Sequence, residues 1–111
     1  MAHSPYDPLM YAYNGGASLA YLADGQYDRA IEFALRSIRE NPSYSSAYKL
    51  LIASLGMAGR ESEAQSPVGQ LLRLEPGFTV QEHRRRFPGS ASEIGDRYCE
   101  ALARAGVPLS A

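Results

Sequence analysis

The sequence predicts an all-α protein built from tandem helical hairpins, and three observations lead to this fold class. Pro8, Pro42 and Pro76 stand 34 residues apart. Apolar residues recur at helical spacing between these prolines. Other positions keep the same register: Gly25 with Gly59, Ala30 with Ala64, Tyr21 with Leu55, Ile38 with Leu72 and Tyr44 with Phe78. A period of this length is typical of repeats in which each hairpin buries its apolar face against the next one.

The composition is that of one small folded domain. The chain has 111 residues, of which 45% are hydrophobic and 21% are charged, so disorder is not expected. The net charge of −1 gives no general attraction to nucleic acid or to an anionic membrane. No apolar run is long enough to span a bilayer, and the N-terminus carries no secretory signal pattern, so we expect a cytoplasmic protein that does not bind a membrane.

The first seven residues are expected to be a tail, and the first repeat is expected over residues 8–42. Asp7 and Pro8 favour a helix start, and a helix is predicted over 8–23. Gly25 supplies the turn, and a second helix is predicted over 27–40. The two predicted apolar stripes are Leu9, Tyr13, Ala17, Ala20 and Tyr21 on the first helix, and Ile31, Ala34, Leu35 and Ile38 on the second.

The second repeat is expected over residues 43–76. Pro42 ends the preceding helix, and Ser43 is a candidate cap for a helix over 44–58. Gly59 supplies the turn before a helix over 61–74, where Pro67 predicts a late start or a local kink. The residues predicted to face inward are Tyr44, Ala47, Tyr48, Leu51, Ile52, Leu55, Ala64, Val68, Leu71 and Leu72.

Residues 77–111 are expected to form a degenerate hairpin and a capping helix. The stretch Phe87-Pro88-Gly89 interrupts the first of these helices after about two turns. Ser90 or Ser92 is expected to start the last helix, which ends at Ala105. The predicted inward residues of that helix are Ile94, Tyr98, Ala101 and Leu102. Such a pair caps the exposed end of a helical array.

The repeat resembles the tetratricopeptide (TPR) repeat, whose pattern is W-x2-L-G-x2-Y, then A-x3-F, then P. The resemblance covers residues 8–78 and departs from the pattern at Asn14, in the tryptophan position, and at Ile52, in the glycine position. It implies a TPR-type α-solenoid with two full repeats and a capping helix pair. The matching positions are Asn14, Ala17, Ser18, Tyr21, Ala30, Ala34 and Pro42, then Tyr48, Leu51, Ile52, Leu55, Ala64, Val68 and Pro76.

The TPR resemblance also implies a protein–protein interaction groove lined by the first helix of each hairpin. Gly15 and Leu19 stand where a clamp for a terminal carboxylate would need polar side chains, so the implied ligand is an apolar segment or helix. A groove that binds nothing, or that holds its own chain, is the alternative. The implied groove residues are Ala12, Gly15, Gly16, Leu19, Ala23, Ser46, Lys49, Ala53 and Met57.

A narrower resemblance concerns three segments, Ser4–Pro8, Leu74–Thr79 and Ala101–Pro108. They are similar to the C-terminal TPR region of certain bacterial class III adenylate cyclases. This resemblance implies the regulatory or assembly tail of a larger signalling protein. Because Pro8 occupies the last position of a repeat whose helices are absent, the first helix is expected to have an uncovered apolar face. A stand-alone adaptor, or a structural homo-oligomer that associates through this helix, is the alternative.

The pair Gly15-Gly16 inside a predicted helix costs about 1 kcal/mol per glycine relative to alanine. It indicates close approach of another backbone, either a partner's or that of a homodimer. Packing of the pair against Tyr48, or a late helix start, is the alternative. The run Arg84–Arg86 is a weaker candidate for binding a polyanion, and a solvated or internally paired face is favoured because Glu75, Glu82 and Glu93 lie nearby in the sequence.

No catalytic constellation emerges from the sequence. His3 and His83 lack a specified acidic partner, and Cys99 is interpreted as a small packing residue. Because Cys99 is the only cysteine, neither an internal disulfide nor a cysteine-based zinc site can form. We therefore expect a non-enzymatic protein without a cofactor.

Overall fold

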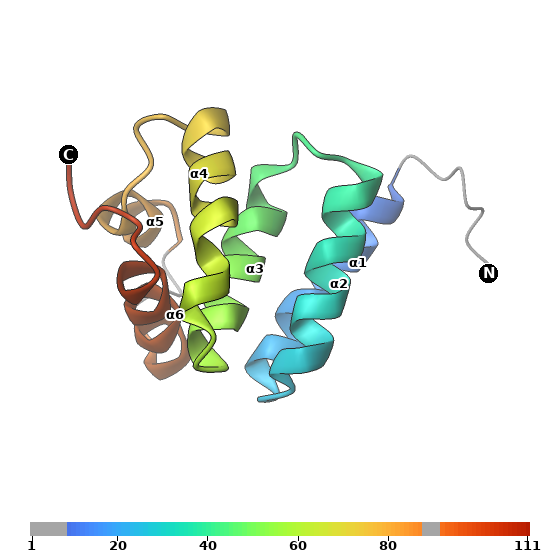
Figure 1. Ribbon diagram of the computed structural model, residues 1–111. Helices are drawn as coiled ribbons and strands as arrows, with labels where there is room; N and C mark the ends of the chain where they lie inside the picture. The colour runs from blue at the N-terminus through green and yellow to red at the C-terminus, as the bar shows by residue number, and fades with distance from the viewer. Residues whose placement is uncertain (1–8, 88–91) are drawn as a thin grey trace.

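The computed structural model describes residues 9–87 and 92–111, and these residues form helices and no strands (Figure 1). The all-α prediction is therefore confirmed for the described chain. A short 3-10 segment, η1 (Glu61–Ala64), precedes α4, so the predicted late start of this helix is confirmed. The α-helices of the described chain are α1 (Met10–Ala23), α2 (Tyr27–Glu40), α3 (Ser45–Met57), α4 (Gln65–Leu74), α5 (Val80–Arg86) and α6 (Glu93–Arg104).

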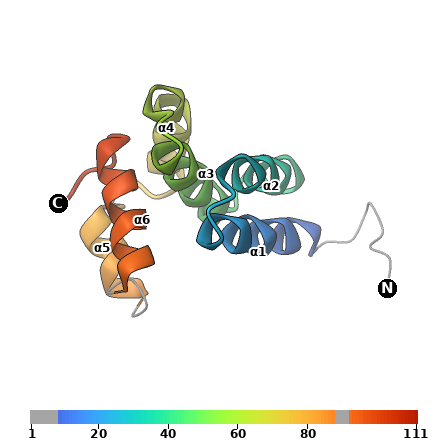
Figure 2. The ribbon, with the colours of Figure 1, turned by 90° about the horizontal axis from the view of Figure 1, so that it is seen from below.

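The helices are arranged around α3. Short turns join α1 to α2 and α3 to α4, and each of these pairs forms a hairpin (Figure 1). The α1–α2 hairpin packs on one side of α3, and α4 and α6 pack on the other (Figure 2). In the same view, α1 and the α5–α6 pair project from the same face of the molecule, with α3 between and behind them.

Helix α3 is enclosed over most of its length. Every residue from Ala47 to Gly56 is buried, although this stretch includes Lys49. The sequence of the helix is apolar on all sides, which is typical of a helix with neighbours on every face. At Gly56 the enclosure depends on the absence of a side chain, because a Cβ atom there would lie 2.8 Å from the Cβ atom of Ala101 on α6. The backbones of α3 and α6 are therefore held in close contact.

The turns inside the two hairpins are equivalent. Gly25 and Gly59 adopt positive φ angles of 79° and 74°, as the sequence predicts, because glycine has no Cβ atom to clash in this conformation. In each turn the amide after the glycine donates to a carbonyl in the last turn of the helix. These hydrogen bonds are Gln26 N to Tyr21 O (2.9 Å) and Arg60 N to Leu55 O (2.8 Å). Ala30 and Ala64, which follow the turns, are both fully buried.

The residues that follow α6 form hydrogen bonds with the start of α5. The amides of Val80 and Gln81, in the first turn of α5, donate to the carbonyls of Pro108 and Leu109 at 2.9 and 3.0 Å. These bonds satisfy donors that a helix start leaves without intrahelical partners. Val107, between α6 and this contact, is 3% exposed and belongs to the core.

Side chains cap the starts of two helices, of which the sequence predicts the one at Ser92, whereas the cap predicted at Ser43 is wrong. Ser92 Oγ accepts from Gly95 N at 3.1 Å at the start of α6, whereas Asp7, Pro8 and Ser90 lie outside the described residues. Thr79 Oγ1 caps α5 by accepting from Glu82 N at 3.0 Å. Ser43 does not cap α3. Its amide instead donates to Asn41 Oδ1 at 3.1 Å, which forms a turn that ends before α3 starts.

The apolar stripe predicted for α1 is wrong at Leu9, Tyr13 and Ala20, which are exposed, whereas Tyr21 is partly buried against the core. The buried residues of α1 are Gly15, Ser18 and Leu22, whereas Leu9 and Tyr13 are 54% and 48% exposed. Ser18 Oγ donates to the carbonyl of Ala30 at 2.7 Å, and this bond turns the small-residue side of α1 toward α2. Close helix contact at small residues therefore decides the orientation, in preference to the largest apolar side chains.

Two other predicted core residues are exposed at the surface. Leu35 on α2 is 40% exposed, because α2 turns Ala30, Ile31, Ala34 and Ser37 inward instead. Ile94 on α6 is 39% exposed, because α6 contacts α3 through its second half, where Ala101 and Leu102 are buried. The predicted inward positions of Ala101 and Leu102 are confirmed.

Candidate binding groove

A groove of about 490 Å³ lies on the face from which α1 and the α5–α6 pair project. Its walls come from α1 on one side and from α5, α6 and Phe87 on the other, and its floor comes from α3. Most of the lining is apolar. The lining residues are Ala12, Gly15, Gly16, Leu19, Tyr44, Ser46, Lys49, Leu50, His83, Phe87, Ile94, Gly95 and Tyr98.

The structure brings together six of the nine groove residues that the sequence indicates: Ala12, Gly15, Gly16, Leu19, Ser46 and Lys49. The other three lie elsewhere. Ala53 is fully buried, because α3 is enclosed along this part of its length. Ala23 is exposed at the last residue of α1, and Met57 is half-buried at the end of α3. Neither residue lines the groove.

The wall formed by the C-terminal residues was missed by the sequence interpretation. Ile94 and Tyr98 were assigned to the core, and His83 was assigned to a basic run. The missed signal is the spacing of the apolar and aromatic residues. His83 and Phe87 are four positions apart, as are Ile94 and Tyr98, so each pair lies on one helical face.

Large apolar side chains surround the groove from three different segments. Leu19 on α1 is 53% exposed, Phe87 after α5 is 47% exposed and Ile94 on α6 is 39% exposed. Single exposed apolar residues are ordinary on protein surfaces, but their convergence on one concavity is typical of an interaction site. The groove therefore offers three apolar contact points on its walls.

The two consecutive glycines of α1 have different surroundings. A Cβ atom on Gly15 would lie 3.2 Å from Cε2 of Tyr44, whereas one on Gly16 would have no atom within 4 Å. Gly15 thus packs against Tyr44 rather than Tyr48, and Tyr48 instead donates its hydroxyl hydrogen to the Pro42 carbonyl at 2.9 Å. The helix starts at Met10, so a late start does not explain the pair. Gly16 leaves an open place in the groove wall.

A buried ion pair lies at one side of the groove floor. Lys49 Nζ is 2.9 Å from Glu75 Oε2, with 6% and 20% of the two side chains exposed. Lys49 Nζ also lies 4.3 Å from the ring centre of Phe78, and Arg86 Nη1 lies 2.8 Å from Glu75 Oε1. Burial alone would raise the pKa of Glu75, but hydrogen bonds from Ser45, Arg86 and Lys49 outweigh it and lower the pKa to about 2. The carboxylate is therefore charged at neutral pH.

His83 stands beside this pair in an aromatic cluster. Its ring stacks on Tyr98, with centres 4.8 Å apart and an angle of 14°, and it also contacts Phe87 and Phe78. Burial lowers the pKa of His83 to about 4, and the charges of Lys49, Arg84 and Arg86 lower it in the same direction. The imidazole is thus neutral at physiological pH. Its Nδ1 atom is buried and has no hydrogen-bond partner among the described residues.

The arginine run is paired with acidic residues of the same chain. Arg84 Nη1 is 2.8 Å from Asp96 Oδ1, Arg85 pairs with Glu82, and Arg86 bridges Glu75 and Glu82. The internally paired face that the sequence favours is therefore present. These bonds tie α5 to α6 and to the residue that follows α4.

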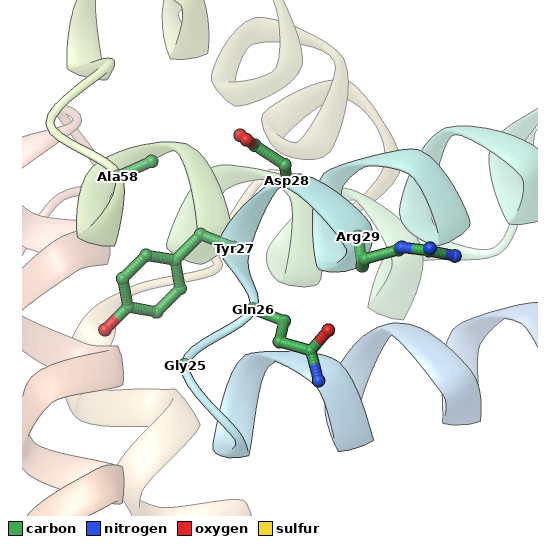
Figure 3. A pocket seen from close by; sticks show the side chains of 6 residues that line it. All are labelled: Gly25, Gln26, Tyr27, Asp28, Arg29 and Ala58. Carbon is green, nitrogen blue, oxygen red and sulfur yellow. The ribbon is translucent and has the colours of Figure 1, made fainter.

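A second hollow of about 450 Å³ lies at the turn between α1 and α2 (Figure 3). Gly25, Gln26, Tyr27, Asp28, Arg29 and Ala58 line it. The side chains of Tyr27, Asp28 and Arg29 point in three different directions and do not converge on a common point (Figure 3). This arrangement supplies no set of polar groups around one ligand position.

The other chemical candidates remain isolated. Cys99 is 1% exposed, and burial raises the pKa of its thiol, which keeps it protonated. His3 lies outside the described residues. Within residues 9–87 and 92–111, no group of three or more His, Cys, Asp or Glu side chains is placed to hold a metal ion. In the same part of the chain, no helix combines the length and the apolar character needed to cross a membrane.

The fold and the groove define an all-helical protein with an apolar concavity between its first and last helices. In comparisons with known proteins, no family model, no curated protein and no solved structure matches the chain. The choice of function therefore depends on the chemistry of the groove.

Proposed function

We propose that the chain is a TPR-type α-solenoid module that binds an apolar helical segment of a partner protein in the groove. The observation that carries this proposal is the convergence of Leu19, Phe87 and Ile94 on a groove whose α1 wall includes Gly15 and Gly16. Exposed apolar side chains around small residues fit the ridge of an apolar helix, as in other helix-in-groove complexes. The volume of about 490 Å³ lies within the range of ordinary ligand sites.

The equivalence of the two hairpins supports the TPR-type arrangement. Gly25 and Gly59 make the same left-handed turn, and Ala30 and Ala64 are buried to the same extent. The α1–α2 hairpin contacts α3 of the second hairpin, as neighbouring units of a solenoid contact each other. Helix α6 packs on α3 and α5 packs on α6, and we interpret this pair as the cap of the array.

The charges around the groove favour a neutral ligand segment. Among the described residues, Lys49 is the only Asp, Glu, Lys or Arg side chain that lines the groove, and its charge is already balanced by Glu75. His83 is neutral because burial and three nearby cations lower its pKa. A charged side chain placed in this groove would lose hydration without gaining an opposite charge. We therefore expect the face of the ligand that enters the groove to be apolar. Polar atoms at the edges of this face can form hydrogen bonds with Ser46 and Tyr44.

Selection from a displayed library of helical peptides tests this function. We expect the selected peptides to carry apolar residues at positions i, i+4 and i+7 without a charge on that face. In fluorescence anisotropy, Ile94→Glu is expected to weaken the binding of these peptides at least about tenfold, because it buries a charge against them. Leu35→Glu is the matched control, since Leu35 is 40% exposed on α2 and does not line the groove.

Selected peptides that bind the Ile94→Glu and Leu35→Glu variants equally well would contradict the groove as the binding site. Circular dichroism of both variants checks that the helical fold is retained. A selected peptide whose binding does not involve the groove residues would show that the protein binds peptides on another face.

We further propose that this module serves as the regulatory or assembly tail of a larger bacterial signalling protein, such as an adenylate cyclase. The support is the resemblance carried by segments 4–8, 74–79 and 101–108. An immunoblot of source cells with an antibody against this domain measures the size of the native product. A band far above 12.1 kDa is the expected result, and a band at 12.1 kDa would refute the tail.

A further inference from the structure

The imidazole of His83 forms no hydrogen bond within the described part of the protein. Its Nδ1 atom is buried without a partner, and Nε2 forms no hydrogen bond with any described residue. His83 is only 9% exposed, and it lines the groove. Buried polar side chains in folded proteins are nearly always hydrogen-bonded. An imidazole left without partners beside a groove therefore indicates a group that the chain itself does not supply.

Aromatic contacts hold this ring in place. It stacks on Tyr98 of α6, with ring centres 4.8 Å apart. The ring centre of Phe87, directly after α5, lies 4.8 Å away, and that of Phe78, before α5, lies 6.4 Å away. Because three segments of the chain contact the ring, it loses little conformational freedom when a ligand binds. The imidazole is thus a preorganised polar group in a mostly apolar groove.

The two nitrogen atoms of His83 differ in their access to a ligand. Nδ1 is enclosed, whereas Nε2 is not, and the open space that His83 borders is the groove. Burial and nearby positive charges lower the pKa of His83 to about 4, so the neutral ring carries one proton at physiological pH. Enclosed N–H groups without an acceptor are rarer in proteins than enclosed acceptors without a donor. We therefore expect the proton on Nε2, where a ligand can accept it.

We propose that His83 donates a hydrogen bond from Nε2 to an uncharged acceptor on the ligand helix, namely the side-chain oxygen of Asn, Gln, Ser or Thr. This inference rests on the proposed function and names the polar residue that the apolar helix carries. The acceptor belongs to a side chain because the carbonyl groups inside a helix already bond to its own amides. A single buried polar residue of this kind fixes the register of a helix on its partner, as it does in coiled coils.

The charges near His83 favour an acceptor that is polar but uncharged. Lys49 and the arginines of α5 place positive charge near the ring, which attracts the negative end of a carbonyl or hydroxyl dipole. These cations already have acidic partners, such as Glu75, which lies 2.9 Å from Lys49 and 2.8 Å from Arg86. A carboxylate on the ligand would therefore lose its hydration in the groove without gaining a free counter-charge.

The position of the proton can be measured on the full-length chain without a ligand. A proton–nitrogen correlation spectrum of the histidine rings distinguishes the two neutral tautomers. We expect the Nε2–H tautomer for His83 near neutral pH. His3 is the only other histidine of the chain, so the spectrum of His83→Phe assigns the signals. A ring that carries its proton on Nδ1 would overturn the proposal, whether or not the groove binds a helix.

Helical peptides selected on the protein test the contact itself. We expect them to carry one Asn, Gln, Ser or Thr beside the apolar ridge. Replacing this residue by an apolar one of similar shape, such as threonine by valine, is expected to weaken binding to the wild type at least about fivefold. The same change in the peptide is expected to leave its binding to His83→Phe unchanged. Because both peptides are compared on one variant, any shift in structure caused by the substitution cancels.

The outcomes separate this inference from the proposed function. Peptides that are sensitive to Ile94→Glu, but whose polar residue contributes equally on wild type and His83→Phe, would overturn the role of His83 and leave the helix-binding groove intact. Selected peptides with Asp or Glu at that position would overturn the uncharged acceptor in the same way. Peptides that bind Ile94→Glu and Leu35→Glu equally well would instead remove the groove as the binding site, and the contact with His83 would fall with it.

Discussion

Replacing Glu75 with glutamine is expected to lower the free energy of unfolding by about 3 kcal/mol. Glu75 accepts from both Lys49 and Arg86, at 2.9 and 2.8 Å, and only 6% of the Lys49 side chain is exposed. The amide keeps the shape of the side chain but removes its charge. Lys49 would then be a buried cation without a counter-charge, beside the ring of Phe78.

Urea unfolding followed by circular dichroism measures this loss. Glu63→Gln is the control, because Glu63 pairs with Arg60 at 2.7 Å on an exposed surface, and no measurable change is expected there. The variant Lys49→Met/Glu75→Gln is expected to recover part of the stability, because it removes the buried cation as well. Equal stability of wild type and Glu75→Gln would mean that the pair is hydrated and contributes little.

Acidification from pH 6.5 to about 4 is expected to lower the free energy of unfolding on the order of 2 to 3 kcal/mol through His83. The unfolded chain takes up a proton on this imidazole near pH 6.5, whereas the folded protein does so only near pH 4. Protons therefore bind the unfolded state first, and stability falls as the pH falls through this window. The positive charges of Lys49, Arg84 and Arg86 lower the pKa of His83 in the same direction as burial does.

The comparison of wild type with His83→Phe isolates this dependence. The phenyl ring retains the stacking on Tyr98 and cannot take up a proton, so the stability of the variant is expected to be nearly flat between pH 6.5 and 5. Glu75 acts in a different window. Because its pKa is lowered to about 2, the stability it provides is present above its ordinary pKa of 4.5 and is lost below that. Parallel pH curves for wild type and His83→Phe would contradict the assignment to His83.

The helices and their order could be predicted from the sequence because they depend on local signals. Glycines at 25 and 59 and prolines at 42 and 76 set the boundaries, and all of these signals act within one or two turns. Both predicted ends of α2 and the predicted last residue of α4 agree with the structure. Boundaries of this kind require no knowledge of which helices meet.

The faces of the helices were harder to predict because they depend on contacts between distant residues. For α1 the sequence interpretation followed the large apolar residues, but the hydrogen bond from Ser18 to Ala30 and the contact of Gly15 with Tyr44 set the orientation. Half of the groove was missed for the same reason. The positions of His83 and Tyr98 depend on how α5 and α6 return to α3, and no repeat period extends to that part of the chain.

The enclosure of α3 has a consequence for how the protein opens. In a linear array, the outermost unit can unfold while its neighbours stay intact. Here the amides of α3 are covered from one side by α1 and α2 and from the other by α4 and α6. Detachment of α1 and α2, or of α4 and α6, would expose α3, which is an apolar helix that is unstable in water. The two groups of helices are therefore coupled through α3. The backbone amides of α3 would therefore exchange with solvent only when the whole domain unfolds.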